Sequence, residues 1–173
     1  MNRPNFLETE ETLTDFLESF ERGTWPKSAW NHAAHVAVAA CYVIEYPDED
    51  AAAHMRRGIV HYNQCVGTVN SDRSGYHETL TLFWLAVVKA RLRELVEGLP
   101  RVEAVRVLVT ELAPQRDLFR EYYSFDVVGS VEARRSWIAP DLKPLTPGTY
   151  DLAPALHFCK TKFPTNMASI PDE

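Results

Sequence analysis

The chain has no long hydrophobic run and no cluster of basic residues. Its apolar stretches are all shorter than the roughly 18–20 residues of a membrane-spanning helix, and its first residues lack the apolar segment of a secretory signal. The net charge of −6 argues against a broad surface for nucleic acid or for anionic membranes. We therefore expect a cytoplasmic protein with no nucleic-acid partner and no membrane partner.

Cysteine is scarce, and the familiar catalytic signatures are missing. The three cysteines, Cys41, Cys65 and Cys159, are widely spaced and form no CxxC pair, so they are interpreted as reduced, apolar side chains, with a catalytic thiol as the alternative. No HExxH, Walker, GxGxxG, GxSxG or EF-hand pattern occurs. The protein classes recognised by those motifs are not indicated.

Helical periodicity is what the sequence does contain. With 173 residues, 46% of them hydrophobic, the chain is long enough for one domain with a substantial core. Apolar residues recur at helical spacing between breaks rich in glycine and proline. The expected fold is an all-α, single-domain bundle of six or seven helices. These helices are expected at residues 9–22, 32–46, 48–66, 76–96, 101–112, 116–123 and 131–137, with a polar loop at 67–75.

The C-terminal part differs from the rest because six prolines fall within its last 34 residues. Such spacing does not permit a long helix. We expect residues 1–145 to form the bundle and residues 146–173 to form an extended, proline-rich arm. That arm contains apolar residues with which to pack on the bundle, and partial disorder is the alternative.

Three of the six histidines are the best candidates for a functional site. His32 and His35 are three residues apart, which places both imidazoles on one face of a helix. His77 follows the polar loop and opens the most apolar helix. All three are expected in the first turn of a helix, where the positive end of the helix dipole disfavours imidazolium. A neutral imidazole can bind a metal or act as a base.

The histidine pattern leaves three interpretations open. Three imidazoles with an open coordination position are typical of a catalytic site for Zn²⁺, Fe²⁺, Ni²⁺ or Cu²⁺. Alternatively, the histidines act as a base or as hydrogen-bonding groups without a metal, or they have only a structural role. His54 and His61 are expected at a solvated rim, and His157, near Cys159, lacks the rest of a ligand set.

The order of several short motifs resembles a group of small uncharacterised bacterial helical proteins. The resemblance covers about residues 28–146 and rests on HxxH (32–35), YHxTxT (76–81), YS (123–124), EAR (132–134) and PDLxPL (140–145). It implies that the first two motifs belong to one site and adds Tyr76, Thr79 and Thr81 to the histidines. His54, His61 and His157 lie outside these motifs.

These observations predict a small-molecule metalloenzyme that activates water or dioxygen. His32, His35 and His77 would bind a divalent transition metal. Glu78 and Tyr76 are the candidate catalytic residues, and Thr79, Thr81 and Tyr123 are the candidate substrate-binding residues. The alternative is a non-catalytic helical domain that binds a small ligand or a protein partner, with the histidines as polar anchors.

Overall fold

Capping side chains set the starts of several helices. The computed structural model describes residues 5–95 and 98–145. Helices α1 (Glu10–Glu21), α2 (His32–Glu45) and α6 (Val131–Arg135) begin after Thr9, Asn31 and Ser130, respectively. The side-chain oxygen of each of these three residues accepts a backbone N–H from the first turn. Asn31 and Ser130 are therefore the N-caps of α2 and α6.

Proline and glycine separate the remaining helices. Helix α3 (Asp48–Cys65) follows Pro47, and α5 (Arg101–Leu112) follows Pro100, whose fixed φ suits a helix start. Helix α4 is Glu78–Arg93. Four short 3-10 helices complete the described residues, which contain no strand: η1 (Asn5–Leu7), η2 (Lys27–Ala29), η3 (Ala113–Gln115) and η4 (Leu118–Glu121). The predicted all-α fold is confirmed.

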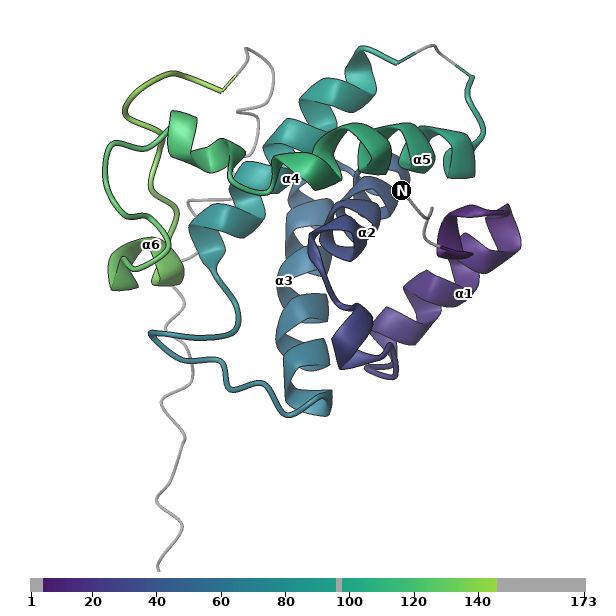
Figure 1. Ribbon diagram of the computed structural model, residues 1–173, viewed down its shortest axis with the longest axis horizontal. Coiled ribbons are helices and arrows are strands. Elements are labelled where there is room, and N and C mark those ends of the chain that lie inside the picture. Colours follow the sequence, from purple (N-terminus) through teal and green to yellow (C-terminus); the bar gives the residue numbers. More distant parts are fainter. Residues whose placement is uncertain (1–4, 96–97, 146–173) are drawn as a thin grey trace, which may run out of the picture.

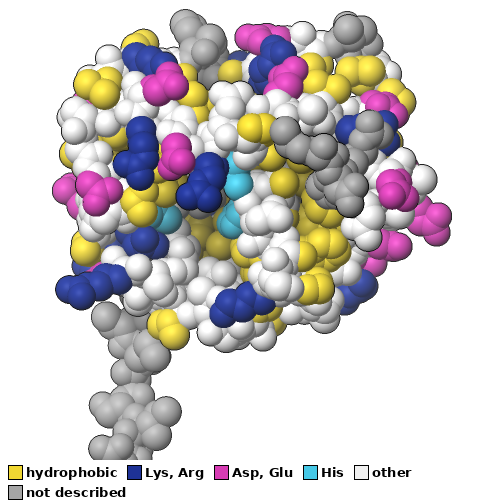
Figure 2. All heavy atoms as spheres, viewed as in Figure 1, with side chains coloured by type: hydrophobic (Ala, Val, Ile, Leu, Met, Phe, Trp, Pro, Cys, Tyr) yellow, Lys and Arg dark blue, Asp and Glu magenta, His cyan; other side chains and the backbone are white. Residues whose placement is uncertain are grey.

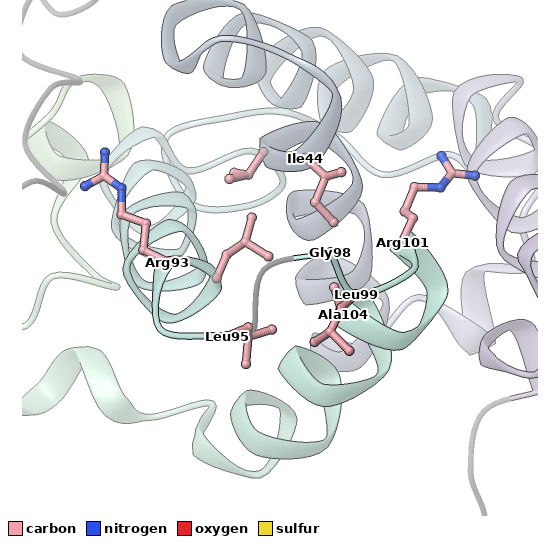
Figure 3. A pocket seen from close by; sticks show the side chains of 9 residues that line it. Ile44, Arg93, Leu95, Gly98, Leu99, Arg101 and Ala104 are labelled. Carbon is pink, nitrogen blue, oxygen red and sulfur yellow. The ribbon is translucent and has the colours of Figure 1, made fainter.

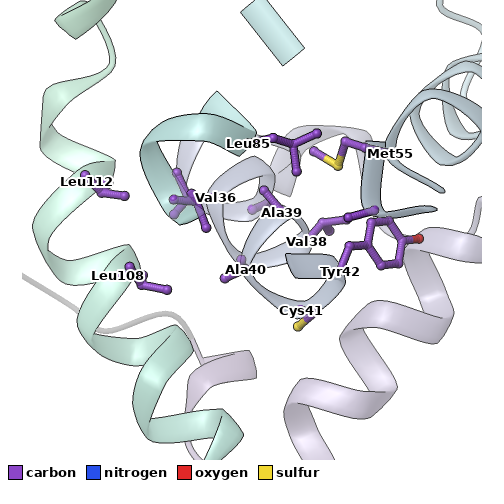
Figure 4. Close-up of a cluster of buried hydrophobic side chains, with 14 of the residues drawn as sticks. Val36, Val38, Ala39, Ala40, Cys41, Tyr42, Met55, Leu85, Leu108 and Leu112 are labelled. Atoms are coloured by element: carbon purple, nitrogen blue, oxygen red, sulfur yellow. The ribbon is translucent and has the colours of Figure 1, made fainter. Parts of the chain in front are cut away.

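Helix α2 lies in the middle of the bundle (Figure 1) and packs against α3, α4 and α5. Eight of its fourteen residues are buried, and four of those eight are alanines. Small side chains let the neighbouring helices approach closely, while Tyr42, Leu85 and Leu108 fill the space around them (Figure 4). Because α2 is held on several sides, its N-terminal His32 is fixed relative to both α4 and α5.

Two predicted helices differ from the structure. Helix α4 begins two residues later than residue 76, because His77 has an extended backbone and acts as the N-cap instead of lying in the first turn. Residues 116–123 form no α-helix. Pro114 falls in η3, and the next turn is the 3-10 helix η4, which has no side-chain cap. Residues 146–173, the predicted arm, lie outside the described ranges.

The prediction that no apolar stretch is long enough to span a membrane can be compared with the helices that the structure describes. Among them, none combines the length and apolar character that crossing a bilayer requires. This finding accords with the hydropathy of the sequence.

Candidate functional site

His77 is held by two backbone groups. Its Nδ1 accepts the N–H of Leu80 at 3.3 Å, as an N-cap does, and its Nε2 donates to the carbonyl oxygen of Val127 at 3.0 Å. Burial is the main cause of the lowered pKa of this imidazole. Both ring nitrogens therefore have partners, and His77 joins the start of α4 to the segment that precedes α6.

Glu78, predicted as a catalytic residue, lies in a buried ion pair. The Nε of Arg56 donates to both carboxylate oxygens at 3.0 Å, and the Tyr76 hydroxyl donates to Oε2 at 2.6 Å. The Glu78 side chain is only 4% exposed. Thr81, also predicted to bind substrate, lies beside Tyr76, whose pKa is raised mainly by burial. These contacts link α3 to α4, and Arg56 gave no sequence signal because it lies 22 residues from its partner.

Thr79 and Tyr123, both predicted to bind substrate, contact one backbone segment. The hydroxyl of Thr79 donates to the carbonyl of Ser136 at 2.7 Å and accepts the N–H of Ile138 at 3.0 Å. The hydroxyl of Tyr123 donates to the carbonyl of Ile138 at 2.9 Å. Together they hold residues 136–138 against α4.

His32 differs from His77 because its Nε2 has no hydrogen-bond partner among the described residues. Burial is the main cause of the lowered pKa of this imidazole, and the Leu112 carbonyl beside the ring opposes that shift. Nε2 itself is buried. A neutral imidazole with its proton on Nδ1 has an unused lone pair on Nε2.

His35 lies one turn further along α2. Burial, followed by the nearby charge of His32, lowers its pKa to about 4. Its ring packs against Trp30 with centroids 4.1 Å apart, and the ring of His32 meets Trp84 edge-on at 4.3 Å. Both imidazoles are therefore neutral at pH 7.

We call this group of side chains, together with the Leu112 carbonyl, the His32 site. It comprises His32, His35, Trp30, Trp84 and Leu112. Figure 2 shows histidine side chains on one face of the molecule, with hydrophobic, Lys and Arg side chains around them. The structure brings His32 and His35 together, as their spacing predicts.

The structure does not complete a three-residue metal site around them. Within residues 5–95 and 98–145, no group of three His, Cys, Asp or Glu side chains is arranged to hold a metal ion. His77 keeps its own backbone contacts. The three-histidine site thus stays a prediction, and the observed geometry supports a site of two histidines more directly.

The other histidines and cysteines occupy separate surroundings. His61 is exposed, with its Nε2 3.5 Å from the Sγ of Cys65, and His54 stacks on Tyr46 with ring centroids 4.0 Å apart. Cys41 is buried in the core, which raises the pKa of its thiol to about 12. His157 and Cys159 lie outside the described residues.

A different concavity lies at the opposite end of α2, between the last turn of α4 and the start of α5. It has a volume of about 510 Å³ and a mainly aliphatic lining that includes Ile44, Leu95 and Leu99. The guanidinium groups of Arg93 and Arg101 point away from it (Figure 3), and Arg101 pairs with Glu10 and Glu45. No histidine is among the described residues that line it.

Comparisons with protein-family models, with curated proteins and with solved structures found no match for this chain. The chemistry of the His32 site is therefore argued from its own residues.

Proposed function

We propose that the protein binds a small molecule at the His32 site, with His32 as the polar anchor. The observation that carries this proposal is the buried Nε2 of His32, which has no partner among the described residues. A buried acceptor without a hydrogen bond costs about 1–3 kcal/mol. A ligand that donates a hydrogen bond to this atom recovers that free energy, which is a reason for the site to bind one.

Aromatic side chains support the same proposal. Trp84 packs against His32 and Trp30 against His35, and both indoles are partly exposed. Ligand sites are mostly apolar, with a few polar groups that fix the orientation of the ligand. The His32 site has this composition, whereas Tyr76, Glu78, Thr79 and Tyr123 are occupied by contacts within the protein.

NMR tests the proposal directly. Long-range ¹H–¹⁵N spectra are expected to show the Nδ1-protonated tautomer of His32 at pH 7, and the Nε2 resonance shifts when a compound from a metabolite set binds. His32→Asn is the informative variant, because its amide nitrogen replaces Nδ1 while nothing replaces Nε2. His61→Asn, at an exposed position, is the control. Binding that survives His32→Asn unchanged excludes His32 as the anchor.

A second function, metal binding, is favoured by the Leu112 contact. Imidazoles that bind metals commonly donate their other ring N–H to a backbone carbonyl or a carboxylate, which fixes the tautomer. The Leu112 carbonyl lies beside the His32 ring, and His35 supplies another neutral imidazole one turn away. Two imidazoles leave coordination positions for water, dioxygen or substrate, as the metalloenzyme prediction requires.

Calorimetric titration of untagged protein with Co²⁺ and Zn²⁺ tests this second function. We expect one ion per chain, with affinity reduced at least about tenfold in His32→Asn and in His35→Gln, the range seen when a ligand or its support is lost. His77→Asn is expected to have no effect on affinity. An equal loss in His77→Asn would instead restore the three-histidine site, with His77 released from Val127.

A further inference from the structure

Cys65 differs from the buried Cys41 because it is exposed and has an imidazole beside its sulfur. It is the last residue of α3, and among the described residues it has no disulfide partner. Its Sγ lies 3.5 Å from Nε2 and 4.0 Å from Nδ1 of His61. The spacing of four residues on one helix keeps these two side chains adjacent. A thiol and a base within hydrogen-bond reach are the two groups that a cysteine nucleophile requires.

The turn between α1 and η2 runs past this thiol without placing a side chain over it. Gly23 has a φ of 71°, and a Cβ there would lie 2.4 Å from Sγ of Cys65 and 3.7 Å from Nε2 of His61. A larger residue at this position would therefore collide with the sulfur. The thiol thus has the bare backbone of the turn beside it and is still exposed to solvent.

The position of Cys65 on its helix makes a neighbouring base important for its reactivity. Cys65 lies at the C-terminus of α3, where the helix dipole does not stabilise a thiolate. The imidazole of His61, which contacts Sγ, is the group that can take the proton. Lys27 is bound at the same end of the helix, with its Nζ donating to the carbonyl of Val66 at 3.3 Å. Its positive charge attracts anionic molecules towards the thiol.

We propose that Cys65 is a site of covalent modification by a small disulfide, with His61 as the base. The imidazole takes the proton of the thiol, and Sγ attacks one sulfur of the disulfide. A new S–S bond to Cys65 forms while the original S–S bond breaks, and the departing thiolate takes the proton back from His61. The small disulfide is itself the oxidant, because one of its sulfurs leaves as a thiol. This site is independent of ligand binding at the His32 site.

Oxidised glutathione is the probe, because it is a small disulfide that carries carboxylates. It is added in excess to the reduced full-length chain at pH 7, and mass spectrometry of peptides locates the mixed disulfide over time. Cys159→Ser is the parent protein, since Cys159 lies outside the described residues. We expect one glutathionyl group per chain, on Cys65. Cys41 is expected to stay unmodified in the folded protein, because burial shields its thiol and raises its pKa to about 12.

Variants of the two histidines on α3 test the role of the base. His61→Gln is expected to slow the modification at least about tenfold at pH 7. This difference narrows towards pH 9, because a thiol with an ordinary pKa of about 8.5 ionises there without a base. His54→Gln, on the same helix, is the control and keeps the rate of the parent. Circular dichroism and thermal unfolding confirm that each variant is folded.

Each contrary outcome overturns a defined part of this inference. If excess oxidised glutathione leaves Cys65 unmodified, or modifies Cys41 equally fast in the folded protein, Cys65 is not a selective modification site. Equal rates for His61→Gln and the parent from pH 7 to pH 9 show that His61 is not the base. Disulfide-linked chain dimers without a glutathionyl adduct would make a second copy, instead of a small disulfide, the partner of Cys65.

Discussion

Two histidines in this protein show how backbone partners decide what an imidazole can do. His77 has both ring nitrogens bound to main-chain groups, which makes it a connector between α4 and residue 127. His32 has a buried Nε2 without a partner among the described residues. His77 thus has both ring nitrogens bound within the protein, whereas the proposed ligand contact of His32 uses a nitrogen that has no such partner.

The low pKa of His35 predicts a loss of stability in mild acid. The folded protein holds this imidazole neutral down to about pH 4, whereas the unfolded chain protonates it near 6.5. Because the unfolded state binds the extra proton, the free energy of unfolding falls as the pH drops from about 6.5 to 4, by about 3 kcal/mol from this residue.

Urea denaturation at pH 7, 6, 5 and 4 measures this effect. His35→Gln, which cannot titrate, is expected to have a flatter pH profile than the wild type over the same range. His61→Gln changes an exposed histidine and serves as the control. Parallel profiles for wild type and His35→Gln contradict the prediction.

The buried pair of Glu78 and Arg56 predicts a large difference between two otherwise similar substitutions. Glu78→Gln leaves the guanidinium of Arg56 without its bidentate carboxylate in a buried place, so we expect a loss of about 2–4 kcal/mol of unfolding free energy. Glu18→Gln breaks the exposed pair with Arg22 and is expected to change stability by at most about 0.5 kcal/mol. Chemical denaturation of both variants gives the comparison. Similar small changes in both contradict the assigned role of Glu78.

Local sequence patterns predicted helix boundaries and the pairing of His32 with His35. They could not predict hydrogen-bond partners that lie far away in the sequence. The side-by-side placement of His32 and His35 follows from their spacing, and the boundaries of α5 follow from Pro100 and Pro114. The partners of His77 and Glu78 lie 50 and 22 residues away. Whether these side chains face a ligand or the protein interior depends on tertiary packing, which periodicity does not encode.

At the scale of elements, the start of α4 is fixed by the loop that precedes it and by the segment around Val127, which follows it in the sequence. Gly75 has a φ of 76°, and a Cβ there would lie 2.5 Å from Oδ1 of Asn70. That oxygen accepts the N–H of Tyr76 at 2.9 Å. The loop thus places His77 at the N-cap of α4. From this position the His77 ring also donates a hydrogen bond to the carbonyl of Val127.

Two substitutions separate these roles of His77. His77→Asn keeps a side-chain oxygen that caps α4 but loses the bond to Val127, so we expect a loss of about 1 kcal/mol. His77→Ala loses the cap as well, and its expected loss is about 2 kcal/mol. Equilibrium unfolding in urea measures both. If Asn is as damaging as Ala, the cap contributes nothing and the long-range bond carries the whole effect.

At the scale of the whole molecule, the position of α2 couples the core to the His32 site. Ala40 is fully buried in α2 and lies among core side chains that include Leu108 and Leu112 of α5 (Figure 4). The carbonyl of the same Leu112 lies beside the His32 ring. The spacing of α2 and α5 therefore sets both the packing of the core and the distance between the His32 ring and this carbonyl.

Ala40→Leu tests this coupling. Overpacking the α2–α5 interface is expected to cost about 1–3 kcal/mol of unfolding free energy, whereas Gln64→Leu, on the exposed face of α3, is expected to change it by at most about 0.5 kcal/mol. Because the larger side chain pushes α5 away from α2, the Nδ1–H signal of His32 also exchanges faster with solvent in Ala40→Leu. If Ala40→Leu is destabilised but the exchange of the His32 ring N–H is unchanged, Leu112 moves together with α2. The geometry of the His32 site would then not depend on the packing of the core.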